Sequence, residues 1–62
     1  MWKVIYIAPS SRVAERINEK LTEEGFLVKL RATSLSKNQF EILVPEGELD
    51  EVQEVLNSIL HR

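Results

Sequence analysis

Cysteine is absent from the 62-residue chain, and histidine occurs once. Disulfides, thiolate metal sites and multi-histidine metal sites are therefore excluded. The apolar opening MWKVIYIA is too short for a membrane span or a signal peptide, and the net charge of −2 gives no strong attraction to nucleic acid. We expect a cytoplasmic protein with no cofactor, no metal and no membrane partner.

The chain is short enough to form one domain at most, covering residues 1–62. A single core of this size supplies only about 3–5 kcal/mol of stability. Small domains add disulfides, metals or oligomerisation to this, and the composition excludes disulfides and metal sites built on cysteine or several histidines. Oligomerisation is the remaining source of stability, so we expect a homo-oligomer, with a dimer favoured.

Hydrophobic periodicity predicts five elements in the order βαββα. Strand-like segments occupy residues 2–8, 26–32 and 39–44, each rich in apolar residues that alternate or form a short run. Residues 11–24 and about 48–60 carry apolar side chains at three- and four-residue spacing, which is typical of amphipathic helices. The sequence therefore predicts an α+β domain.

Turn-forming residues set the predicted boundaries. Pro9 ends the first strand, and Gly25 is placed where a left-handed residue commonly ends a helix. Residues 33–38, TSLSKN, form a polar loop between two antiparallel strands. Pro45 ends the third strand, and Gly47 is a candidate N-cap for the second helix.

The element order favours one sheet topology. A right-handed crossover through the first helix leaves room for the third strand between the first two, antiparallel to both. The predicted sheet order is 1-3-2, with both helices on one face in a two-layer sandwich. This is the ferredoxin-like plan without its last strand.

Two surfaces remain uncovered in this topology. Strand 2–8 is an apolar edge strand, and proteins rarely leave such an edge bare. The sheet face opposite the helices carries residues 27, 29, 31, 41 and 43, together with either residues 2, 4 and 6 or residues 3, 5 and 7. We favour the first set outside, because Ile5 and Ile7 suit the core. The predicted interface is Trp2, Val4, Tyr6, Leu27 and Leu43.

Two blocks of the chain resemble a known family. The first holds Val4, Tyr6, Ala8, Ala14, Leu21 and Gly25; the second is ILVPEGELDEVQEVL, residues 42–56. These positions are similar to a small bacterial family described as prokaryotic signal-transducing proteins, which are ferredoxin-like and compared with the PII nitrogen-signalling proteins. The resemblance implies a regulatory or interaction role.

Some relatives of such short chains carry the label glutamate decarboxylase. A pyridoxal-phosphate enzyme needs a lysine within a large enclosed pocket. Because 62 residues cannot build such a pocket alone, the sequence does not support that label.

The segment Ser10-Ser11-Arg12 is the candidate anion site. A helix start offers free N–H groups and a positive dipole end, and the hydroxyls and guanidinium add direct contacts. The segment lacks the glycines of phosphate-binding loops. The alternative is that Ser10 or Ser11 is a simple N-cap, worth about 1 kcal/mol.

No other residues indicate a specific chemistry. Tyr6 faintly resembles an RNA-binding strand, but Gln39, Glu41 and Leu43 replace the stacking aromatics of the central strand, so nucleic acid is not expected. His61 is penultimate, and the acidic residues 46–51 fit a helix dipole.

We expect no catalytic residue and no enzyme activity. The predicted function is a regulatory or interaction module that self-associates through strand 2–8 or the open face, or meets an unknown protein partner; the alternative is a small-anion or nucleotide sensor.

Overall fold

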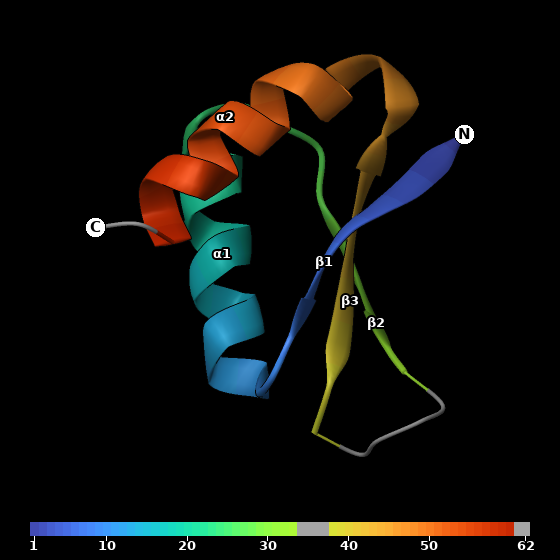
Figure 1. The fold of residues 1–62 in the computed structure, drawn as a ribbon, viewed down its shortest axis with the longest axis vertical. Coiled ribbons are helices and arrows are strands. Elements are labelled where there is room, and N and C mark those ends of the chain that lie inside the picture. Colours follow the sequence, from blue (N-terminus) through green and yellow to red (C-terminus); the bar gives the residue numbers. More distant parts are fainter. Residues whose placement is uncertain (34–37, 61–62) are drawn as a thin grey trace.

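The structure, a computed structural model, describes residues 1–33 and 38–60. Among these residues, strands β1 (Trp2–Ala8), β2 (Lys29–Ala32) and β3 (Phe40–Pro45) form an antiparallel sheet in the order β1-β3-β2. Helices α1 (Ser11–Glu23) and α2 (Leu49–Leu60) cover one face of that sheet (Figure 1). The predicted α+β plan and the sheet order 1-3-2 are confirmed.

Some predictions fall outside the described residues. They are those for loop residues 34–37 and for His61. Within the described ranges, neither helix has the length and apolar character needed to cross a membrane.

The end of α1 follows the prediction for Gly25. This glycine has a φ of 93°, and its N–H donates to the carbonyl oxygen of Thr22 at 3.0 Å. The N–H of Phe26 donates to the carbonyl oxygen of Leu21 at 3.1 Å. This pair of hydrogen bonds is the Schellman arrangement, which satisfies the last helical carbonyls and turns the chain back toward the sheet.

The prediction that Gly47 caps the second helix is wrong. A short 3-10 turn, η1 (Glu46–Glu48), follows β3, and α2 begins only at Leu49. The carboxylate of Glu48 accepts a hydrogen bond from the N–H of Leu27 at 3.2 Å. The turn therefore also satisfies the backbone of the segment that leads into β2, a tertiary contact that local capping rules do not anticipate.

The core lies between the helices and the facing side of the sheet. Both helices contribute the apolar stripes that their spacing predicts, and β3 contributes its alternate residues. The buried cluster is Ala8, Ala14, Ile17, Leu21, Ile42, Val44, Val52 and Leu56. Phe26, Val28 and Leu30 pack against it from the β2 side, as their alternation predicts.

Strand β1 contains a bulge at Ile5. Val4 pairs with Leu43 and Tyr6 pairs with Ile42, so Ile5 has no partner in the register. An inserted residue shifts the following side chains to the other face. Ile5 and Tyr6 both pack against the core, and Ile7 takes the open face. The prediction that Tyr6 faces outward and Ile7 inward is therefore wrong.

Candidate functional site

The face of the sheet opposite the helices carries exposed apolar side chains. On β1, Trp2 is 39% exposed, Val4 is 43% exposed and Ile7 is 50% exposed. Leu27, just before β2, is 61% exposed. Because large aliphatic and aromatic side chains seldom gather in the open, this face is the candidate functional site. We call Trp2, Val4 and Ile7 the apolar row.

Leu43 lies at the centre of this face yet is only 5% exposed. It pairs with Val4 of β1 on one side and with Lys29 of β2 on the other. The ammonium of Lys29 lies 4.8 Å from the centroid of the Trp2 ring, a cation–π contact that spans the strand between them. The neighbours of Leu43 thus cover it without help from a helix, and a partner would reach little of its surface.

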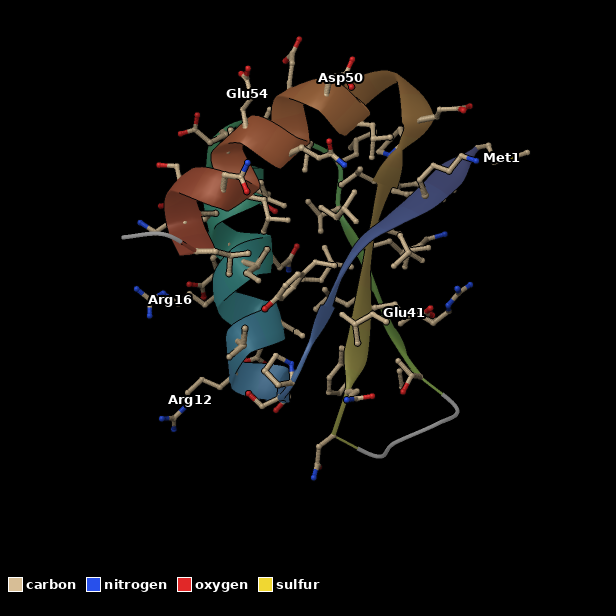
Figure 2. All side chains as sticks on the ribbon, viewed as in Figure 1. Met1, Arg12, Arg16, Glu41, Asp50 and Glu54 are labelled. Carbon is tan, nitrogen blue, oxygen red and sulfur yellow. The ribbon has the colours of Figure 1, made fainter. Side chains whose placement is uncertain are left out.

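The cationic side of the open face lies on β2. The guanidinium Nε of Arg31 contacts Glu41 Oε1 at 2.7 Å, and the two residues are register partners. Figure 2 shows Glu41 on the side of the sheet turned away from the helices. We call Lys29 and Arg31 the cationic row. The open face is therefore apolar along β1 and cationic along β2.

The outer edge of β1 has no neighbouring strand among the described residues. The N–H of Glu46 donates to the carbonyl oxygen of Met1 at 2.9 Å. Bonded and non-bonded pairs alternate along an antiparallel ladder, so Lys3 is the next residue bonded to β3. Trp2 and Val4 then direct their N–H and C=O groups away from β3.

Ser10 is the N-cap of helix α1. Ser10 has extended backbone angles, and its Oγ accepts a hydrogen bond from the N–H of Val13 at 3.3 Å. The N-cap interpretation is therefore confirmed for Ser10. Ser11 and Arg12 are exposed, and Figure 2 shows Arg12 extending away from the body of the domain. Anion binding at these residues stays a prediction, with the Ser10 oxygen already engaged.

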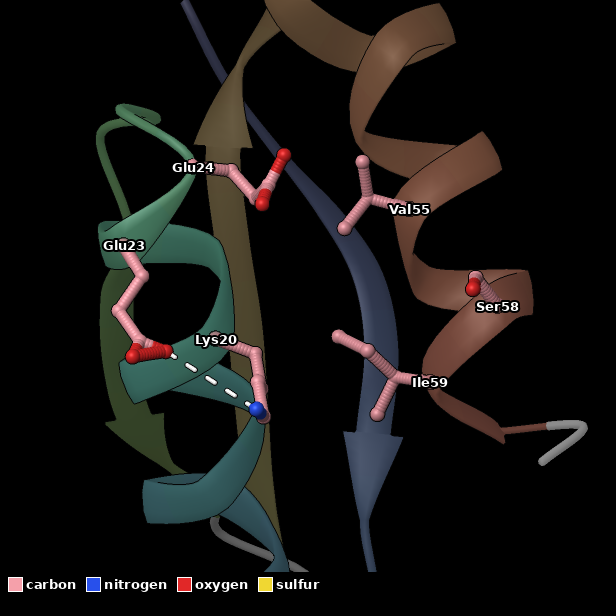
Figure 3. Close-up of a pocket in the computed structure, with 6 residues that line it drawn as sticks. All are labelled: Lys20, Glu23, Glu24, Val55, Ser58 and Ile59. Atoms are coloured by element: carbon pink, nitrogen blue, oxygen red, sulfur yellow. Dashed lines mark ion pairs between the residues drawn. The ribbon is translucent and has the colours of Figure 1, made fainter.

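An open pocket of about 300 Å³ lies between the two helices (Figure 3). Its lining is Lys20, Glu23, Glu24, Val55, Ser58 and Ile59. The Lys20 ammonium and the Glu23 carboxylate are 4.0 Å apart, on side chains that are 48% and 66% exposed. No group of three or more metal-ligating side chains occurs within residues 1–33 and 38–60. The pocket therefore presents a solvated ion pair beside the apolar side chains of Val55 and Ile59.

Sequence reasoning missed one member of the candidate site and misplaced another. Ile7 belongs to the open face and Tyr6 does not, because of the bulge at Ile5. No local residue in WKVIYIA marks a bulge, since the segment has neither glycine nor a polar break. The predicted positions of Trp2, Val4, Leu27 and Leu43 on the open side agree with the register and the exposure, except that Leu43 is covered.

Comparisons of the chain with protein-family models, with curated proteins and with solved structures give no significant match. The family resemblance therefore stays a prediction. What can be argued about function rests on the fold and on the open face.

Proposed function

We propose that this protein is a small, non-enzymatic interaction module that associates with a second copy of itself, in a regulatory role. The self-association would use β1, either through its outer edge or through the open face of the sheet. Both routes cover groups that a single chain leaves exposed: backbone N–H and C=O groups at the edge, and apolar side chains on the open face.

One observation carries the proposal. A single strand, β1, presents Trp2, Val4 and Ile7 on the side that neither helix covers. The core of so small a domain gives it only marginal stability, and apolar side chains that stay in water add little to that stability. Burial against a partner recovers about 25 cal/mol for each Å² of apolar surface removed from water.

The charge of the chain is compatible with self-association. A net charge of −2 on 62 residues gives weak repulsion between copies at physiological ionic strength. Since the open face carries Lys29 and Arg31 against Glu41, its own balance is slightly positive, whereas the helices hold most of the carboxylates. The open face therefore carries more basic than acidic side chains among the described residues of the sheet.

Sedimentation equilibrium over micromolar to millimolar protein tests the proposal. A molar mass that rises with concentration toward twice the 7.2 kDa of one chain is the expected result. A constant mass of one chain over the whole range would contradict it. Adding salt should strengthen or leave unchanged an association driven by apolar burial, whereas an ion-pair contact would weaken.

A further inference from the structure

The bulge at Ile5 limits what the outer edge of β1 can offer. Regular outward N–H and C=O groups are available at Trp2 and Val4, and beyond Val4 the inserted residue breaks their spacing and bends the strand. An antiparallel pairing with a second β1 would place Lys3 opposite Lys3 when Trp2 pairs with Val4. Like charges directly opposite each other destabilise a ladder. The edge therefore supports only a short and repulsive pairing.

The outer edge of β2 is protected as well. This strand spans only Lys29–Ala32, and two of its four residues are basic. Short edge strands and basic side chains are devices that keep sheets from adding further strands. Both edges of the sheet thus disfavour strand addition, while the face between them stays apolar on one side.

From these observations we infer that the second copy docks on the open face, sheet against sheet, rather than on the edge of β1. This inference rests on the proposed self-association and names the surface that makes it. The pair is isologous, so each copy contributes the same apolar row and the same cationic row.

The placement of charge selects the symmetry axis of the pair. An axis perpendicular to the strands would lay β2 on β2, with Lys29 and Arg31 of one copy against the same residues of the other. An axis along the strands lays the apolar row of each copy over the cationic row of its partner. The aliphatic stems of Lys29 and Arg31 can then pack on Val4 and Ile7 of the second copy. Lys29 can also approach the Trp2 ring of that copy. The axis therefore runs along the strands.

The size of the face predicts a weak dimer. β1 has seven residues, and three strands spaced about 4.8 Å apart at about 3.3 Å per residue give a face on the order of 300 Å² in plan. Counting both copies and the area of their protruding side chains, roughly 700–1,000 Å² becomes buried. This is less than the area of stable specific interfaces and falls among weak, transient ones. The dimer should form in the micromolar to millimolar range, where sedimentation can follow it.

Two substitutions at Val4 separate the face from the edge. Val4→Pro removes the outward N–H but keeps an apolar side chain, whereas Val4→Lys keeps the N–H and places a charge opposite the partner's cationic row. A face dimer predicts that Val4→Lys raises the dissociation constant roughly thirtyfold or more, as loss of a central anchor does, while Val4→Pro changes it only about twofold. Gln53→Lys, on the exposed side of α2, is the matched control and should leave it unchanged.

A third substitution at the same position tests the axis. Val4→Glu should weaken the dimer less than Val4→Lys, because the partner's Lys29 then faces a carboxylate. Equal losses from the two charges would overturn the axis along the strands. Far-ultraviolet circular dichroism confirms that each variant is folded.

The outcomes keep the two proposals apart. A wild-type chain that stays monomeric overturns self-association itself. A wild-type dimer that survives Val4→Lys, whether or not it survives Val4→Pro, overturns docking on the open face and leaves self-association standing. If Val4→Pro does not fold, Ile7→Lys carries the test, with loss of the dimer expected and an unchanged dissociation constant overturning the inference.

Discussion

The two faces of strand β3 show how differently one sheet can be covered. Ile42 and Val44 point toward the helices and are fully buried, while Leu43, between them, is buried on the open side, where its register partners are Val4 and Lys29. On the helix side, burial comes from residues far apart in the sequence. On the open side, burial comes from neighbouring side chains of the sheet itself. These leave Val4 43% exposed and Ile7 50% exposed. Most of the buried apolar surface therefore lies on the covered face, whereas the open face keeps partly exposed side chains.

The largest expected change in stability comes from replacing an isoleucine on each of the two faces. We expect Ile42→Ala to lower the free energy of unfolding by about 2–5 kcal/mol, because it leaves a cavity between sheet and helices. For a domain of about 3–5 kcal/mol this approaches complete unfolding. Ile7→Ala, measured at a concentration where the chain is monomeric, should cost less than about 1 kcal/mol. Urea unfolding followed by circular dichroism gives both values, and equal losses would contradict the division between the faces.

The next test concerns the turn that returns the chain from α1 to the covered face. Gly25→Ala places a side chain at a φ of 93°, which costs about 1–2 kcal/mol even though no atom lies within 4 Å of the added Cβ. Gly47→Ala also meets open space, but without a left-handed φ, and should be neutral or slightly stabilising. Thermal unfolding of the two variants measures the difference, and a Gly25→Ala variant as stable as Gly47→Ala would show that the turn relaxes without strain.

A smaller effect is expected at the other end of α1. Ser10→Ala removes the oxygen that accepts from the Val13 N–H and should cost about 1 kcal/mol. Ser11→Ala lies one residue further on and should change stability by a few tenths of a kcal/mol at most. Unfolding in urea distinguishes the two serines, and a larger loss at Ser11 would mean that the cap is assigned to the wrong residue.

The smallest effect belongs to the ion pair on the open face. Arg31 and Glu41 are close, but the Arg31 side chain is 61% exposed, so water screens the pair. A double-mutant cycle with Arg31→Gln and Glu41→Gln should give a coupling of about 0.2–1 kcal/mol that shrinks as salt is added. A coupling well above this, insensitive to salt, would indicate that the open face is less solvated than its exposure implies.

Much of the fold follows from local pattern. The helical spacing of Ala14, Ile17 and Leu21 selects one face of α1, and Gly25 ends that helix where the chain must turn. The alternation of Phe40, Ile42 and Val44 selects one face of β3. These features need only neighbours in sequence, so periodicity alone predicts them.

Two contacts depend on residues distant in the sequence and escaped prediction for that reason. The Glu48 carboxylate accepts a hydrogen bond from the Leu27 N–H across 21 positions, and Glu48 belongs to the 3-10 turn that precedes α2. Likewise, the Trp2 ring meets Lys29 only because β3 lies between their strands.

By itself the sequence determined the element order and the helix faces, because both follow from the spacing of apolar residues. It placed the N-cap of α1 at Ser10 or Ser11, and the structure selected Ser10. The tertiary structure alone decided which side chains of β1 meet solvent after Val4. The register between β1 and β3 contains one inserted residue, Ile5, and a shift of one residue exchanges the two faces of a strand. Ile7 thereby replaces Tyr6 on the open face, and the candidate site is defined by that exchange.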